Sequence, residues 1–332
     1  MEKFSRAYVR WIRYAVQWGL LAFIVYGGFR FYLFVEHFKG NGPLVSRPAL
    51  VEGFLPIGAL MSLKVWLGGG SINSTHPAAL MILVAALLVS LVLIKSFCGW
   101  ICPVGAVSEL CHKAGRLVFR RNFRLHRYLD YPLRSLKYIL LGLFLYIIMY
   151  RMDAWSIGEF MSSEYWRVAD VKMLHFFTDM STTTLYVLGA LVVLSVFIKN
   201  FWCRYLCPYG ALTGLLGIFS PFKVTRDDER CIHCNKCTRE CPNLLDVEST
   251  RRVISPECSG CMTCVSVCPA RGALDVASPG RVRVNPLLYA VMVLVIFFGV
   301  ILAAQRTGHW ESDVTYEQYR RLVPIASSFE HP

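Results

Sequence analysis

The sequence lacks the signatures of several cofactor-binding protein classes. It contains no C-x-x-C-H haem-attachment motif, no G-x-G-x-x-G dinucleotide-binding motif and no flavin-attachment motif. A haem, flavin or hydride donor that takes part in the function of this protein is therefore expected on another chain.

Acidic residues, and charged residues in general, are scarce. Asp and Glu number 22 against 35 Lys and Arg, which gives a net charge of +13, and only 17% of residues are charged. The chain is 55% hydrophobic with a mean hydropathy of +0.46, too apolar for a soluble protein. In a soluble chain the basic excess would suggest nucleic acid, but here the cations lie mostly beside hydrophobic runs, where they set membrane topology. The composition predicts a membrane protein without a nucleic-acid partner.

The apolar runs predict about five transmembrane helices, since a ~30 Å hydrocarbon core needs about 20 residues at 1.5 Å each. The predicted spans are residues 14–35, 77–97, 135–150, 183–198 and 286–304. No small-residue cleavage site follows the first run, which favours an uncleaved signal anchor. Residues 48–67 are apolar but interrupted by charges and proline, and they are expected to lie at the interface or to re-enter the membrane.

The charge distribution predicts how these spans are oriented. Residues 112–137 hold eight Lys and Arg against the single Asp130, which indicates a cytoplasmic loop by the positive-inside rule. The alternative for this charge is docking of an acidic redox partner. Residues 151–181 hold five acidic and three basic residues and are predicted to be periplasmic. In a bacterial inner membrane, five spans then leave residues 1–13 in the cytoplasm and a tail, residues 305–332, in the periplasm.

Twelve of the thirteen cysteines fall into four motifs, which indicates metal or redox chemistry in a reducing compartment. Two of these motifs are C-x2-C-x2-C-x3-C-P runs that begin at Cys231 and Cys258. In bacterial ferredoxins the fourth cysteine of each run binds the cluster of the other run. One predicted [4Fe–4S] ligand set is Cys231, Cys234, Cys237 and Cys268, and the other is Cys258, Cys261, Cys264 and Cys241.

The alternatives for the two runs are zinc knots and a disulfide knot. Zinc sites usually pair two C-x2-C motifs, without the third cysteine or the trailing proline, and disulfides suit secreted chains. The pattern therefore favours a cytoplasmic α+β ferredoxin-like domain with two clusters over residues 225–280. This domain is inserted between a four-helix membrane domain, residues 14–222, and the fifth span.

The other two cysteine motifs form an internal repeat, C-x3-C-P-x-G-A, whose copies lie 105 residues apart and each follow a predicted helical hairpin. A parallel repeat about an axis normal to the membrane would bring its four cysteines together. Such thiols are ligands for a third iron–sulfur cluster or a transient copper ion. The alternative is that they merely pack or form disulfides at a helix–loop junction. The four candidate residues are Cys98, Cys102, Cys203 and Cys207.

With these motifs in hand, the chain resembles the NapH/NosR/CcoG group of membrane polyferredoxins. CGWICPVGAVSEL and CRYLCPYGAL match the paired CxxxCP motifs of that group, and the doubled ferredoxin run follows in the same order. The resemblance covers residues 10–304. It is nearest to NapH-like and YccM-like proteins, because neither a long N-terminal flavin-binding region nor a periplasmic immunoglobulin-like domain is expected here.

The resemblance implies electron transfer at the cytoplasmic membrane. The expected donor is the quinone pool or a cytoplasmic protein, and the expected acceptor is a periplasmic redox protein or reductase subunit that carries haem or flavin. Clusters on the cytoplasmic side need a further carrier to cross a ~30 Å core: a quinone, the CxxxCP thiols or a cofactor of the partner. The alternatives are a copper-reducing assembly factor for a metalloenzyme and a scaffold whose clusters only hold the fold.

Overall fold

The computed structural model describes residues 2–120, 123, 125–278 and 282–330. Parts of four predicted segments fall outside these residues: Met1 of 1–13, residues 121–122 and 124 of 112–137, residues 279–280 of 225–280, and the last two residues of 305–332. The chain forms two compact units. The cysteine unit comprises residues 1–21, 86–141 and 189–298 and contains all thirteen cysteines, whereas the second unit comprises residues 22–85, 142–188 and 299–332.

Three helical segments among the described residues are long and apolar enough to cross a membrane. They are Tyr8–Phe38 within α1 (Glu2–Phe38), Tyr128–Arg151 across α6 (Arg127–Leu145) and η2 (Tyr146–Arg151), and α14 (Pro286–Arg306). They confirm that apolar helices occupy three of the five predicted runs. Helix α1 already begins at Glu2, so the basic residues before the apolar run extend this helix rather than precede it.

The two remaining predicted spans are less clear in the structure. Helix α3 (Pro77–Val92) has 16 residues, about 24 Å at 1.5 Å per residue, which is short for a ~30 Å core. Helix α10 (Thr182–Phe197) meets the length criterion only together with α9 (Ala169–Thr178), from which it is bent by 76°. The count of five spans therefore stays a prediction.

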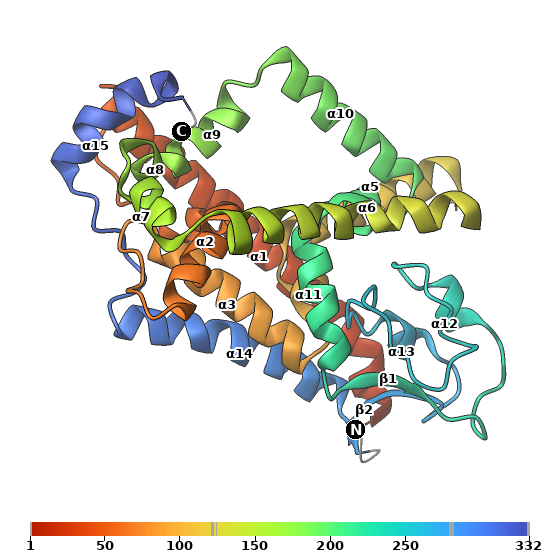
Figure 1. Cartoon of the computed structure of the whole chain (residues 1–332). Coiled ribbons are helices and arrows are strands. Elements are labelled where there is room, and N and C mark those ends of the chain that lie inside the picture. The colour runs from red at the N-terminus through yellow and green to blue at the C-terminus, as the bar shows by residue number, and fades with distance from the viewer. Residues whose placement is uncertain (1, 121–122, 124, 279–281, 331–332) are drawn as a thin grey trace. The chain divides into compact units, whose positions relative to one another are not determined.

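Each CxxxCP motif begins in a short helix and is followed by a longer one. Short helices and strands then form the region of the doubled ferredoxin run. These elements are α4 (Ser96–Trp100), α5 (Pro103–Phe119), η3 (Trp202–Leu206), α11 (Pro208–Phe219), β1 (Lys223–Arg226), α12 (Lys236–Arg239), α13 (Thr263–Val267), β2 (Leu274–Ala277) and β3 (Arg283–Val284). The three strands pair antiparallel in the order β1-β2-β3, with Val224 opposite Val276 and Val276 opposite Val284. Figure 1 shows α12 and α13 beside this sheet. The result is a small α+β domain whose two helices each start inside a cysteine run.

The second unit has both an apolar core and a buried polar core. Its other elements are η1 (Ala49–Phe54), α2 (Pro56–Leu67), α7 (Ala154–Ser162), α8 (Glu164–Arg167), α15 (Tyr316–Leu322) and η4 (Val323–Ser328). Phe34 packs edge-on against Tyr319 of α15 within the apolar cluster. Arg47 donates to Asp170 at 2.7 Å and to Glu52 at 2.8 Å. Because these carboxylates come from η1 and α9, the buried guanidinium ties both elements to the loop before η1.

Candidate metal centres

The two cysteine runs fold into loops of the same shape. His233 and Gly260 occupy equivalent positions and have φ values of 50° and 55°, and the same holds for Asn235 and Met262 at 56° and 57°. A non-glycine residue in this left-handed region costs on the order of 1–2 kcal/mol. Both loops adopt left-handed conformations at the same two positions between the first and third cysteine. Each of these conformations turns the chain. The loop shape is therefore a specific feature of both runs.

Each predicted ligand set lines its own cavity. The first cavity has an empty volume of about 350 Å³, is partly open, and is lined by Cys231, Cys234, Cys237 and Cys268. The second cavity has an empty volume of about 360 Å³ and is lined by Cys241, Cys258, Cys261 and Cys264. In both cases the fourth cysteine comes from the other run. The structure thus brings together the same groups of four that the spacing predicts.

The second cavity is more deeply buried than the first. Cys241 and Cys258 are 7% and 9% exposed, whereas Cys234 of the first cavity is exposed. Burial raises the pKa of Cys241 to about 11 and that of Cys258 to about 12. These thiols therefore stay protonated at neutral pH unless a metal binds them and releases their protons. The donor set fits a thiolate-bound metal group rather than free reactive cysteines.

The described residues contain neither a preformed single-ion site nor a disulfide. Zinc holds its sulfurs at about 2.3 Å, so four sulfurs around one ion lie roughly 4 Å apart. Among the described residues no three His, Cys, Asp or Glu side chains gather so closely around one point. All thirteen cysteines are described, and none forms a disulfide.

The two CxxxCP motifs also share a local geometry. Cys102 precedes α5 and Cys207 precedes α11, each in an extended conformation and each followed by a proline at the first helical position. The backbone N–H of Gly210 donates to the sulfur of Cys207 at 3.2 Å. An N–H group at a helix start favours negative charge on the sulfur, as a metal ligand requires.

The four thiols of these motifs lie near one another in the cysteine unit. Cys203 interacts electrostatically with Cys98, Cys102 and Cys207. Cys98 and Cys203 line a third, polar cavity with an empty volume of about 560 Å³. Cys111, in α5, does not line this cavity. The structure thus places Cys98 and Cys203, from segments 105 residues apart, at one cavity, whereas Cys102 and Cys207 do not line it, and the four-cysteine site stays a prediction.

Both CxxxCP motifs also contact backbone segments that line the second cavity. Trp100, fully buried between Cys98 and Cys102, donates from Nε1 to the carbonyl of Gly260 at 2.9 Å. Arg204, from the second motif, donates to the carbonyl of Asn243 at 2.6 Å. Each half of the repeat therefore contacts one of the two segments that surround the second cavity. The 560 Å³ cavity is accordingly lined by Cys98, Cys203 and Cys261 together.

Comparison with known proteins identifies the family. The chain is 44% identical to YccM of Escherichia coli (strain K12), whose name describes an electron transport protein, over 96% of this chain and 91% of that protein. A family model for a 4Fe-4S binding domain matches residues 75–126 and 181–226, and one for a 4Fe-4S dicluster domain matches residues 223–269. The chain belongs to the membrane-associated 4Fe-4S ferredoxin-type proteins.

Other relatives of this ferredoxin-type protein agree with the predicted resemblance. The ferredoxin-type protein NapH of Escherichia coli (strain K12) is 27% identical over 74% of this chain and 77% of its own length. The regulatory protein NosR of Stutzerimonas stutzeri is 27% identical over 51% of this chain but only 22% of its own length. No solved structure matches the chain significantly.

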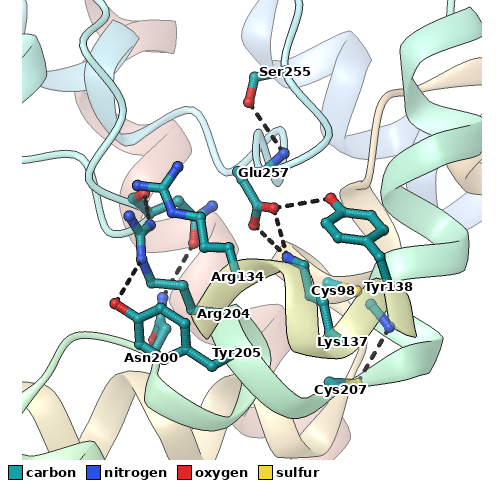
Figure 2. A network of polar contacts seen from close by, with 12 residues as sticks. Cys98, Arg134, Lys137, Tyr138, Asn200, Arg204, Tyr205, Cys207, Ser255 and Glu257 are labelled. Carbon is teal, nitrogen blue, oxygen red and sulfur yellow. Dashed lines mark hydrogen bonds and ion pairs between the residues drawn. The ribbon is translucent and has the colours of Figure 1, made fainter. Parts of the chain in front are cut away.

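Sequence analysis missed a set of buried ion pairs in this ferredoxin-type protein. Figure 2 shows Lys137 and Tyr138 pointing to the carboxylate of Glu257, with Lys137 at 2.6 and 2.7 Å from its two oxygens. Arg204 binds Asp130 at 2.9 Å, and Arg13 binds Glu109 at 2.7 and 2.8 Å. The partners lie 74 to 120 residues apart in the sequence. One sequence has no periodic signal that pairs such distant residues.

Proposed function

We propose that this protein passes electrons between the quinone pool or a cytoplasmic donor and a periplasmic redox partner, through two [4Fe–4S] clusters and a third centre at the CxxxCP thiols. The observation that carries this proposal is the shared cavity of Cys98, Cys203 and Cys261. It links the thiols of the membrane motifs directly to a ligand of the second ferredoxin loop. A structural scaffold would have no need for three adjoining thiol groups.

The proposed ligands of the two ferredoxin-type clusters are the two groups of four that line separate cavities. Each bound cluster would supply a one-electron redox couple whose potential depends on its charge, hydrogen bonds and exposure. The chain contributes the two matching loops, the exchange of the fourth cysteine between them, and burial of the second site. Because Cys234 is exposed and Ile232 is 64% exposed, the first site is the proposed point of exchange with a soluble partner.

A third iron–sulfur centre is proposed at Cys98, Cys102, Cys203 and Cys207. Two observations support it. The 4Fe-4S binding family model matches both stretches that contain these cysteines. In addition, both second cysteines occupy the same helix-start position, as the proposed parallel repeat requires. The alternative is that these soft thiolates bind copper for the maturation of another enzyme.

The orientation and partners are proposals that follow from charge and family. We place the ferredoxin-like domain in the cytoplasm because residues 112–137 are basic. The tail is then periplasmic in a five-span arrangement. The names of YccM and NapH, an electron transport and a ferredoxin-type protein, support an electron-transfer chain. Electrons would then cross the membrane on a quinone, or through the haem or flavin of a partner protein.

The orientation gives a prediction that reporter fusions can check. A reporter inserted near Asp130 should be active only if it functions in the cytoplasm, and one fused after Pro332 only if it functions in the periplasm. The physical reason is that cationic loops stay on the cytoplasmic side. Both reporters on the same side would contradict the three spans predicted between Asp130 and Pro332, and the reverse pair would contradict the orientation.

The electron-transfer function is tested by rapid mixing. The full-length purified protein is reduced with dithionite, freed of excess reductant and mixed with a short-chain menaquinone or ubiquinone analogue. We expect the iron–sulfur absorbance to return to its oxidised level in proportion to the quinone added. If the clusters stay reduced with both quinones and also with a periplasmic extract, the protein does not carry electrons to these acceptors and the proposal is wrong. Tight stoichiometric binding of Cu(I) by iron-free thiols, without such reoxidation, would favour the copper alternative.

A further inference from the structure

Two buried ammonium groups lie next to the CxxxCP thiols. Lys95 is 5% exposed and Lys137 is fully buried. Lys137 is neutralised by Glu257, which also accepts a hydrogen bond from Tyr138 at 3.1 Å (Figure 2). Lys95 lines the 560 Å³ cavity together with Cys98, Cys203 and the same Glu257, and its ammonium lies beside Gly210, as does the sulfur of Cys207. Two cations therefore share one carboxylate at this place.

Arg13 and Arg204, the other two cations that line the same cavity, each have a carboxylate partner. Arg13 pairs with Glu109, and Arg204 pairs with Asp130. The outer partners Lys113 and Arg134 contact the same two carboxylates from more exposed positions. Lys95 differs from them because Glu257 already pairs with a second buried cation, Lys137, and it faces the same cavity as Cys98 and Cys203. Burying an unbalanced ammonium is strongly unfavourable, so the site is built for a negatively charged occupant.

Metal-bound thiolates supply this negative charge, whereas free thiols carry none. A [4Fe–4S] cluster with four thiolates is an anion, and its reduction adds a further negative charge. A buried cation beside it favours the reduced state, because the attraction is little screened in a low-dielectric site. Counted back from the first cysteine, the equivalent position of the second motif is Asn200, and the buried Lys199 precedes it by one residue.

We propose that Lys95 is the charge-compensating residue of the CxxxCP centre, which holds the anionic cluster and raises its reduction potential. This inference rests on the third centre proposed above. Lys95 is thus a positioning and tuning residue rather than a ligand. Glu257 lies near both Lys95 and Lys137, and its negative charge lowers the reduction potential that Lys95 raises.

The test is a redox titration, followed by EPR, of the full-length protein in detergent. In Lys95→Met the third centre should be reducible only at a potential at least 59 mV lower, a tenfold change for a one-electron couple. Lys95→Arg should restore the wild-type potential. Glu257→Gln, which removes the opposing charge, should shift the potential upward. Lys64→Met is the control, since Lys64 donates to backbone carbonyls of Ile148 and Met149 in the second unit, and its potentials should match wild type.

The outcomes separate this inference from the proposed function. An unchanged potential in Lys95→Met, or the same shift in Lys95→Met and Lys95→Arg, would overturn the role of the charge. Loss of the third centre's iron in Lys95→Met but not in Lys95→Arg would support it. If the wild-type protein holds only about eight irons, enough for two cubes, it has no third centre, and the proposed function fails at that point.

Discussion

Replacement of Cys203 by serine should remove the third centre and leave the two ferredoxin-type clusters intact. The iron content should fall from about twelve to about eight per chain, because each cube holds four irons. A serine oxygen is a poor ligand for iron that selects soft thiolates. Reoxidation of the reduced protein by the quinone analogue should be lost as well. Iron analysis and rapid mixing of the same sample measure both effects.

The same prediction distinguishes one site from four separately packed cysteines. Residues that act as a unit are non-additive, so the double variant Cys98→Ser/Cys203→Ser should lose little more than either single variant. Cys111→Ser is the matched control, because Cys111 lies in the same unit but belongs to neither CxxxCP motif. Near-neutral single variants whose small effects simply add would show that these cysteines only pack.

The second large effect is expected on stability, from Glu109→Gln. Arg13 is 1% exposed and depends on both carboxylate oxygens of Glu109. Removing one partner of a buried ion pair costs about 3–5 kcal/mol, because the other charge stays buried. Arg13 also donates to the carbonyl of Gly99, within the first CxxxCP motif. We therefore expect earlier thermal unfolding and loss of the third centre's iron in the same variant.

Lys113→Gln is the control for Glu109→Gln. Lys113 contacts the same carboxylate at 2.9 Å, but its side chain is 33% exposed, so its loss should change stability by less than about 1 kcal/mol. Thermal unfolding in detergent, followed by circular dichroism, gives both values. Equal stability of the two variants would show that burial of Arg13 does not make its partner essential.

The same ion pair gives a pH dependence with a defined sign. Burial alone would raise the pKa of Glu109, but the hydrogen bonds and charge of Arg13, with Lys113, lower it from 4.5 to about 2. A lowered folded-state pKa contributes stability that is complete above the unfolded value and is lost as the pH falls. Wild type should therefore lose stability between about pH 4.5 and pH 2 by an amount that Glu109→Gln lacks. Parallel unfolding curves for both proteins over this range would contradict the assignment.

The local sequence predicts which cysteines line each of the two ferredoxin-loop cavities, because cysteine spacing is a short-range property. The two C-x2-C-x2-C-x3-C-P runs specify which four cysteines share each cavity, and Pro103 marks the start of α5. Hydropathy also identifies the apolar helices, although the 16 residues of α3 and the bend before α10 leave the number of spans open. Helix α1 begins at Glu2, so the helix also includes the basic residues that precede the predicted span.

The parts that sequence analysis missed depend on distant partners. Lys95 appears in the sequence as one cation at the end of an apolar run, and only the fold places it among Cys98, Cys203 and Cys207. Trp100 appears as one of three spacer residues, yet its indole N–H reaches the second ferredoxin loop. Such contacts follow from tertiary packing, which neither propensity nor motif spacing encodes. They nevertheless join the CxxxCP motifs to the ferredoxin loops.

The most direct test of three adjoining centres is to count them in the wild-type protein. Iron, acid-labile sulfide and the integrated EPR spins of the fully reduced, full-length chain are measured on one sample. We predict about twelve irons, about twelve sulfides and three interacting spins, four irons and four sulfides for each cube. Eight irons with two spins would leave the CxxxCP thiols without a cluster. Stoichiometric zinc without sulfide would contradict iron–sulfur chemistry altogether.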